Sequence, residues 1–273
     1  MQLRVATRGG LDDFGMPLET LSLKDQVAVV VGGTTGIGRA LSLGLSAAGA
    51  HVVASSRRAE QVEAVAAELE RAGRPALRLT ADVTRRESVE ALCQAVLERY
   101  GKVDILVNCA GRTERRPTLE LDDASFQAIL DTNLNGTLRC CQVFGRSMIA
   151  RGYGRIINIA SLSSFVAFYE VAAYSASKAA VVSLTQTLAV EWARHGVSVN
   201  AIAPGVFRTD LNAKLLDGTA RGQELLLRTP AGRFGKHEEL QGAAVFLASP
   251  AASFVTGAVI PVDGGFLASG VNQ

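Results

Sequence analysis

The sequence predicts an α/β fold in which one parallel β-sheet is covered by helices on both faces. The chain has 273 residues, of which 48% are apolar and 20% charged, so it is long enough to bury a large core. Short runs rich in β-branched residues alternate with longer segments of helical periodicity, as in a doubly wound sheet. Aromatic residues make up 5%, while Ala and Gly are abundant, which favours helices packed closely on a sheet over an all-β sandwich.

Seven apolar runs have the length and composition of buried strands. Because continuous apolar strands are typical of sheets covered on both faces, we expect a seven-stranded parallel sheet. The expected strands are 26–32, 51–56, 76–83, 103–111, 154–161, 196–205 and 258–265. The segments between them with helical periodicity are expected to form helices over 36–48, 59–73, 86–101, 122–150 and 169–192.

The linkers between these elements are short, and no Pro- or Ser-rich hinge divides the chain, so we expect one domain over 23–273. Residues 1–22 mix polar and apolar side chains and lack the apolar core and cleavage site of a secretory signal, so we expect a flexible extension. Residues 206–235 are the least regular part and contain four glycines and one proline. We expect this segment to form a mobile flap over a cleft.

Charge and cysteine content exclude several classes of partner. The formal net charge is +2 and the basic residues are scattered, so neither nucleic acid nor an anionic membrane is expected as a partner. No apolar run approaches the length of a membrane span. Four cysteines without CxxC spacing and three histidines give no support to a metal site, and the cysteines are interpreted as buried reduced thiols. A cytoplasmic, reducing compartment fits best.

The segment VVVGGTTGIGRA (29–40) places a glycine-rich turn between the first strand and the first helix. Glycines let the backbone approach a ligand closely, and the helix N-terminus that follows favours a phosphate. The spacing is Gly-x-x-x-Gly-x-Gly, and a glycine triplet alone is a weak signal. Its place after the first strand of a parallel sheet strengthens the prediction of a dinucleotide site. The candidate residues here are Gly32, Thr34, Thr35, Gly36, Ile37 and Gly38.

The end of the second strand indicates which dinucleotide is bound. NAD sites usually place a carboxylate about 20 residues after the glycine loop, where it binds the ribose 2′-hydroxyl. Here the chain reads SSRRAE (55–60), with no acid before Glu60. Ser56 can donate a hydrogen bond to a 2′-phosphate and Arg57 can pair with it, so we expect NADP(H), with NAD(H) as the second possibility. The alternative is that Arg57 simply begins a solvated helix.

Three further motifs follow in order along the chain: DTNLNG (131–136), INIASLSS (157–164) and YSASK (174–178). A Tyr and a Lys four residues apart share a helix face, which by itself is most often only a solvated surface. Together with the glycine loop, however, these motifs resemble the short-chain dehydrogenase/reductase family from about Lys24 to Leu267. The resemblance implies a Rossmann-type fold and the catalytic set Asn133, Ser161, Tyr174 and Lys178, in which the serine precedes the tyrosine by 13 residues.

The resemblance also implies contacts with the cofactor beyond the glycine loop. In ADV (81–83), NCAG (108–111) and PGVFRT (204–209), the matching positions are Asp82, Val83, Asn108, Ala110, Gly111, Pro204, Gly205, Val206 and Thr209, with Tyr174 and Lys178 added from the catalytic set. Val31 stands where the family has a threonine, a departure at the strand end that leaves phosphate binding possible. Such proteins are commonly homotetramers, so a homotetramer, or a homodimer, is implied.

The expected chemistry is hydride transfer coupled to proton transfer on a carbonyl oxygen. A free tyrosine has a pKa of about 10, and a neighbouring ammonium lowers the pKa of a phenol by roughly 1–3 units, so Lys178 is expected to lower that of Tyr174. By family resemblance, Ser161 hydrogen-bonds the substrate oxygen and Asn133 holds a water that links Lys178 to solvent.

The substrate is less constrained. The segments 228–249 and 253–266 are similar to gluconate 5-dehydrogenases and 3-oxoacyl-carrier-protein reductases. The cleft is expected to be lined by 112–116, 162–170 and 206–235. Phe165, Phe168 and Tyr169 suggest an apolar wall, whereas Arg112, Glu114, Arg115 and Arg116 either face a polar or anionic substrate or are solvated loop charges. Glu170 has no assigned role.

The leading hypothesis is an NADP(H)-dependent oxidoreductase that interconverts a ketone and a secondary alcohol on a small molecule, such as a sugar acid like gluconate or a polyol. One alternative is a 3-oxoacyl-thioester (acyl-carrier-protein) reductase, which would need a basic patch that the sequence does not display. The other is a dinucleotide-sensing protein without catalytic activity, which the complete catalytic set disfavours.

Overall fold

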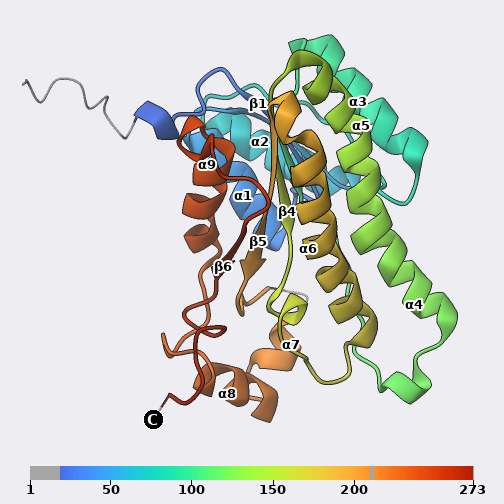
Figure 1. Cartoon of the computed structure of the whole chain (residues 1–273), viewed down its shortest axis with the longest axis vertical. Helices are drawn as coiled ribbons and strands as arrows, with labels where there is room; N and C mark the ends of the chain where they lie inside the picture. The colour runs from blue at the N-terminus through green and yellow to red at the C-terminus, as the bar shows by residue number, and fades with distance from the viewer. Residues whose placement is uncertain (1–18, 210–211, 273) are drawn as a thin grey trace, which may run out of the picture.

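The computed structural model describes residues 19–209 and 212–272. Within them, six parallel strands form one sheet in the order β2-β1-β3-β4-β5-β6 (Figure 1). The strands are β1 (Val27–Val31), β2 (His51–Ser55), β3 (Ile105–Asn108), β4 (Gly154–Ile159), β5 (Val197–Pro204) and β6 (Val259–Val262). This confirms a Rossmann-like α/β fold with a parallel sheet flanked by helices.

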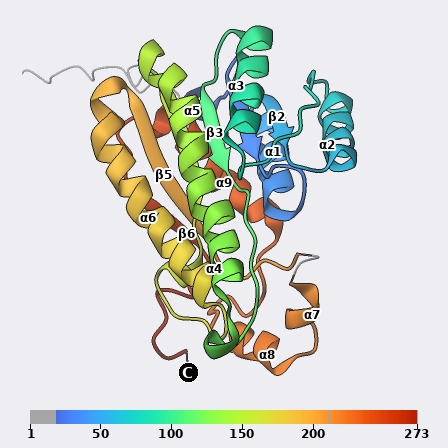
Figure 2. The same ribbon diagram turned by 90° about the vertical axis from the view of Figure 1, so that its right-hand side faces the viewer.

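Helices cover both faces of the sheet, as Figures 1 and 2 show. One face carries α1 (Gly36–Ala47), α2 (Ala59–Arg71) and α9 (Gln241–Ala248), and the other carries α3 (Arg86–Tyr100), α5 (Gly136–Arg151) and α6 (Ala172–Trp192). The remaining helices are α4 (Asp123–Leu130), α7 (Ala213–Leu216) and α8 (Ala220–Leu227). Short 3₁₀ turns occupy Glu19–Leu21, Thr118–Glu120, Leu162–Ser164, Ala193–His195, His237–Leu240 and Pro250–Ala252, and a π-helical turn occupies Asp131–Asn135.

The strands are largely apolar because helices cover both faces of the sheet and a separate core is buried on each face. In β1 every residue is buried, with Val29 facing α3, α5 and α6 and Val30 facing α1 and α9. Alternate side chains of a strand point to opposite faces, so a strand buried on both sides must be apolar throughout. Full burial of a Val, Leu or Ile side chain stabilises the fold by about 1.5–3 kcal/mol.

The expected strand over 76–83 is wrong, which reduces the sheet from seven strands to six. The segment lies beside β2, where the Ala81 N–H donates to the Ser56 carbonyl at 3.0 Å and the Ser55 hydroxyl donates to the Leu79 carbonyl at 2.7 Å. These contacts do not repeat as a ladder. Arg78 instead forms ion pairs with Glu63 and Glu70 of α2, so the segment is held partly through its side chains.

The helical predictions hold, with two main differences in extent. The long helix expected over 122–150 is divided into α4, the π-helical turn and α5, and the helix expected from residue 169 begins at Ala172. The irregular segment 206–235 contains α7 and α8, which lie together at one end of the molecule (Figure 2). Of the expected N-terminal extension, residues 1–18 lie outside the described residues. Among the described helices, none has the length and apolar character to cross a membrane.

The sheet order reverses direction between β1 and β3, and ligands of such sheets bind beyond the strand ends at this point. The two loops that leave β1 and β3 are in direct contact there. Gly32 has φ of +80°, and a Cβ built on it would lie 2.4 Å from the Ala110 nitrogen. A Cβ on Gly38 would lie 2.0 Å from the Gly32 carbonyl oxygen. Only glycine therefore allows this packing at the start of α1.

Replacing Gly38 should disrupt this turn. We expect Gly38→Ala to lower the free energy of unfolding by about 1–3 kcal/mol, because the new methyl group meets backbone that cannot move freely. Gly242→Ala in α9 is the matched control, since a Cβ there has no neighbour within 4 Å. It should be neutral or stabilise the fold by up to about 1 kcal/mol. Urea unfolding measures both, and equal stabilities would contradict the prediction.

Candidate active site

Ser161, Tyr174 and Lys178 come together where β4 ends and α6 begins. Ser161 is the second residue after β4, and its hydroxyl accepts a hydrogen bond from the Ser163 N–H at 3.2 Å, which caps the following 3₁₀ turn. The side chains of Ser161 and Tyr174 are hydrogen-bonded to each other. The Ser164 hydroxyl donates to the Lys178 carbonyl at 2.8 Å, so the same turn is attached to α6. The tyrosine and serine predicted from the sequence therefore share one site.

Lys178 is a buried cation with a backbone partner. Its side chain is 5% exposed, and its Nζ donates to the Ile159 carbonyl at 2.6 Å. The same Nζ lies 5.9 Å from the centroid of the Tyr174 ring. Within the described part of the chain, no carboxylate forms an ion pair with it. An ammonium group has three donors, so this geometry leaves two N–H groups for a ligand.

Burial dominates the ionisation of both groups. It lowers the pKa of Lys178 to about 8, an effect that the nearby Cys109 thiol partly offsets. It raises the pKa of the Tyr174 phenol above its usual value, although the hydrogen bond with Ser161 acts in the opposite direction. The expectation that Lys178 lowers the pKa of Tyr174 is therefore wrong for the chain without its cofactor. The buried Cys109 thiol, which the sequence analysis did not include in the site, lies close to both groups, and burial raises its pKa to about 11.

Asn133 lies in the π-helical turn between α4 and α5, and all of its amide contacts are internal. Its Oδ1 accepts from the Arg112 N–H at 2.8 Å, and its Nδ2 donates to the Arg112 carbonyl at 2.9 Å and to the Ser177 hydroxyl at 3.0 Å. A Cβ on Gly111 would lie 3.5 Å from the Asn133 Oδ1 and 3.8 Å from the Lys178 Nζ. Asn133 thus joins the loop after β3 to α6 beside Lys178, and its role in holding a water stays a prediction.

The glycine loop and the first residues of α1 (32–38), called the cradle below, lie next to this cluster. Gly36 has φ of +48°, and a Cβ built on it would meet Thr209 at 3.4 Å. Thr35 is the N-cap of α1 and is exposed, and its side chain makes no capping hydrogen bond. The Thr34 hydroxyl donates to the Ser56 hydroxyl at 2.8 Å, which joins the loop to the end of β2. These features fit a dinucleotide, whose phosphates need free backbone N–H groups at a helix N-terminus.

Among the residues predicted to contact the adenine and the ribose, Arg57 and Asp82 are accessible to solvent, whereas Val83 and Asn108 are buried. Partial burial raises the pKa of Asp82, but hydrogen bonds from Thr84 and the charges of Arg57 and Arg85 outweigh it and hold that pKa below its usual value. Arg57 is exposed and close enough to act on this carboxylate. Val83 packs against Gly136 at the start of α5.

Asn108 points away from the cradle. Its Nδ2 donates to the Asn158 Oδ1 at 2.8 Å, and Asn158 in turn donates to the Thr185 hydroxyl at 2.9 Å. This buried network joins β3, β4 and α6. The side chain of Asn108 therefore fixes the strand end, whereas its neighbours Ala110 and Gly111 face the glycine loop and Lys178.

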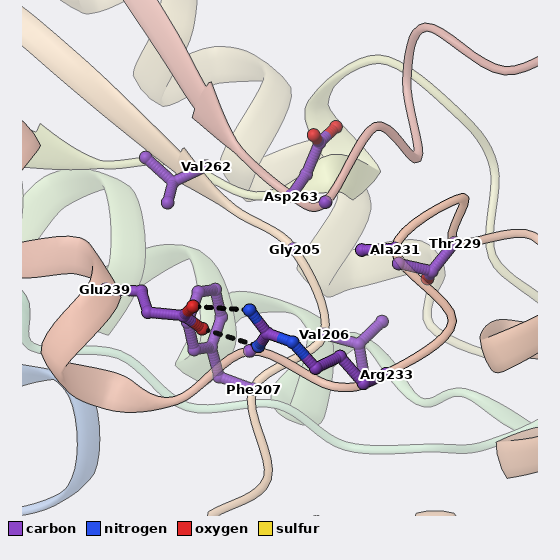
Figure 3. Close-up of a pocket in the computed structure, with 11 residues that line it drawn as sticks. Gly205, Val206, Phe207, Thr229, Ala231, Arg233, Glu239, Val262 and Asp263 are labelled. Atoms are coloured by element: carbon purple, nitrogen blue, oxygen red, sulfur yellow. Dashed lines mark hydrogen bonds and ion pairs between the residues drawn. The ribbon is translucent and has the colours of Figure 1, made fainter.

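The segment after β5 borders a separate hollow of about 130 Å³ (Figure 3). Gly205 packs against Asp263, since a Cβ on it would lie 2.6 Å from the Asp263 Cα. Figure 3 shows the ion pair of Arg233 and Glu239, with N–O separation 2.6 Å, on the wall near Val206. Ser161, Tyr174 and Lys178 do not line this hollow, so it is separate from their cluster.

A parallel sheet with a glycine cradle at its switch point and a Ser-Tyr-Lys cluster beside it defines an NAD(P)-dependent oxidoreductase that acts on CH–OH groups. Residues 31–267 match the family described as enoyl-(acyl carrier protein) reductase. The chain belongs to the short-chain dehydrogenase/reductase family.

Named relatives share this architecture. The chain is 41% identical to the 2-dehydro-3-deoxy-D-gluconate 5-dehydrogenase of Dickeya dadantii, over 93% of this chain and 100% of that protein. It is 40% identical to the gluconate 5-dehydrogenase of Gluconobacter oxydans, over 92% and 98%. The crystal structure of a gluconate 5-dehydrogenase from Burkholderia cenocepacia in complex with NADP and tartrate superposes with a TM-score of 0.90, at 40% identity and covering 93% and 100%.

The buried ammonium predicts a stability profile. The pKa of Lys178 falls from 10.5 to about 8 on folding, so between these values the unfolded chain binds more protons and stability rises with pH. Relative to Lys178→Met, wild type should gain about 2 kcal/mol of unfolding free energy between pH 8 and pH 10. Urea unfolding of both proteins at each pH measures this difference, because other titrating groups cancel. A difference that is constant with pH would show that the amine is not buried as described.

Proposed function

We propose that the chain is an NADP(H)-dependent dehydrogenase that interconverts a ketone and a secondary alcohol on a sugar acid such as gluconate. The observation that carries this proposal is the buried cluster in which Tyr174 is hydrogen-bonded to Ser161 and lies one helical turn from the Lys178 ammonium. The sugar-acid part is supported by the names of the relatives, which include two gluconate-type dehydrogenases.

The chain's own residues would handle the proton. When bound, the nicotinamide supplies or accepts the hydride. In ketone reduction, the Tyr174 hydroxyl donates its proton to the carbonyl oxygen while the Ser161 hydroxyl hydrogen-bonds the same oxygen. The charge of Lys178 then stabilises the phenolate that remains on Tyr174. In alcohol oxidation the same groups act in reverse, and Tyr174 accepts the proton.

Preference for NADP(H) is supported by the end of β2. Ser56 and the exposed Arg57 are available to a 2′-phosphate, and no carboxylate precedes Glu60 to repel it. The structures of related proteins include complexes with NADP. Lys178 would contribute its two remaining N–H donors to the ribose hydroxyl groups, and Thr35 and the N–H groups at the start of α1 would hold the phosphates.

The entrance to the cleft supports an anionic substrate. Arg115 and Arg116 each have acidic partners, at 2.6 Å to Glu170 and 2.6 Å to Glu114. The exposed guanidinium of Arg112 has no hydrogen-bond or ion-pair partner among the described residues, and its backbone is fixed by Asn133 at the site. A sugar acid would supply a carboxylate there, which a neutral polyol lacks.

We also infer a cytoplasmic homotetramer, or homodimer, in which the segment 206–235 closes over the cleft. The buried thiols of Cys93, Cys140 and Cys141 are compatible with a reducing compartment. The helices α7 and α8 belong to this segment. The oligomeric state follows from the family alone.

Tyr174→Phe tests the proton donor. This variant keeps the ring and its packing but lacks the hydroxyl, so we expect kcat to fall by a factor of about 10²–10⁴. NADPH affinity, measured by fluorescence titration, should change far less than kcat. The assay panel contains 5-keto-gluconate, neutral ketoses and 3-oxoacyl thioesters. Normal turnover of the variant would remove the mechanism, and a preference for the thioesters would favour an acyl-thioester reductase instead.

Arg57→Ala tests the choice of cofactor. Loss of one charge-assisted hydrogen bond costs about 1.5–3 kcal/mol, so KM for NADPH should rise by about 10–100-fold while KM for NADH stays the same. Arg58→Ala is the matched control, because Arg58 is also exposed and is the N-cap of α2. If wild type already prefers NADH, or if both variants behave alike, the assignment of Arg57 is wrong.

A further inference from the structure

Glu170 connects the loops on the open side of the catalytic cluster. Its carboxylate pairs with the Arg115 Nε at 2.6 Å, and its backbone carbonyl accepts from the Arg116 N–H at 2.8 Å. The Glu170 side chain is 17% exposed, whereas that of Arg115 is 40% exposed, so the carboxylate is the more buried partner. One residue thus holds the segment 162–171 to the segment 112–117 through both its backbone and its charge.

The helix α8 meets the same point. Arg221 of α8 donates from Nη1 to the Tyr169 carbonyl at 3.3 Å. Burial and the charge of Arg115 lower the pKa of Arg221, while Glu170 and Glu224 act in the opposite direction. The charge of Glu170 therefore acts on arginines from two other segments, one in the loop after β3 and one in the flap.

The backbone of Glu170 is in the left-handed region, with φ of +64°. Among the described non-glycine residues, only Asp25 shares a positive φ. An L-residue other than glycine adopts this conformation only where contacts with its surroundings outweigh the steric cost. Here the surroundings are the two contacts to Arg115 and Arg116.

The segment that Glu170 terminates has an exposed apolar surface. Phe165 is 49% and Tyr169 is 74% exposed, and Phe168 contacts Phe266 with ring centroids 6.0 Å apart. Residues 165–169 therefore gain little from burial, so the position of this stretch depends on its attachments. The catalytic side is attached separately, since Ser164 and Ile159 both hydrogen-bond Lys178.

We propose that Glu170 is a positioning residue that holds the segments 112–117, 162–171 and α8 together as the wall of the substrate cleft. It acts on substrate affinity through this wall, while the geometry of Ser161, Tyr174 and Lys178 is maintained by their own contacts. The proposal rests on the proposed function in that it takes this side of the cluster to be the substrate side.

The test variant is Glu170→Gln, which removes the charge and keeps the size and backbone. We expect faster amide hydrogen exchange in 112–117, 162–171 and 220–227, and a rise of about two- to fivefold in KM for the sugar acid. The change in kcat should be smaller than the change in KM, and NADPH affinity should be unchanged. Glu114→Gln is the matched control, because its ion pair with Arg116 lies within the segment 112–117. It should leave exchange in 162–171 and 220–227 unaltered.

A charge reversal makes the result specific. The double variant Glu170→Arg with Arg115→Glu should restore slow exchange in the three segments, whereas Glu170→Arg alone should not. Unaltered exchange in Glu170→Gln, or a loss confined to kcat, would overturn the proposal. Hydrogen exchange requires no substrate, so it tests the positioning role of Glu170 even if wild type turns over none of the assay panel. That absence of turnover would instead refute the proposed function.

Discussion

The hydrogen bond from the buried Lys178 ammonium to the Ile159 carbonyl is the contact on which the geometry of the site depends. Moving this ammonium out of water lowers its pKa from 10.5 to about 8, which corresponds to roughly 3 kcal/mol. The Ile159 carbonyl stands at the end of β4, so this contact fixes where α6 docks on the sheet. Tyr174 is one turn earlier on the same helix and is thereby brought to Ser161, two residues beyond Ile159.

The glycine loop is connected to Lys178 through the closely packed glycines of the loops after β1 and β3. Gly32 packs against Ala110, and Gly111 lies next to both Asn133 and Lys178. The approach at Gly32 is shorter than a side chain would allow, whereas a Cβ on Gly111 would be in ordinary contact with Asn133 and Lys178. Because β1 and β3 are hydrogen-bonded neighbours at the switch point, a dinucleotide on the glycine loop must come close to the lysine.

Much of this fold could be predicted from local patterns, and the exceptions have physical causes. Continuous apolar runs identify the strands of the sheet because both faces are buried. The segment 76–83 has a similar composition, but whether it pairs depends on the edge of β2, which is a long-range property. The π-helical turn at Asp131–Asn135 changes backbone hydrogen bonding without changing the side-chain period, so no periodicity reveals it.

The candidate site shows the same division between local and long-range information. The resemblance to the family implied Ser161, Tyr174 and Lys178, which the structure brings together. The direction of the pKa shift of Tyr174 could not be predicted, because the distance rule for a neighbouring charge ignores burial, and burial is known only once the fold is complete. The position of the Cys109 thiol beside Tyr174 and Lys178 and the contacts of Asn108 were likewise hidden, since they depend on which strand lies next to β3.

The proposed substrate side is built on a different principle from the proposed catalytic side. Lys178, Ser161 and Asn133 are held by hydrogen bonds to buried backbone and side chains, so their positions change only if the sheet or α6 changes. Residues 162–171 and α8 meet instead through arginines and one acidic residue on partly exposed loops. Ion pairs of this kind are weakened by solvent and salt, so this wall can shift at low energetic cost. A fold arranged in this way can alter which alcohol it admits through a few loop charges while the proton-transfer geometry stays constant.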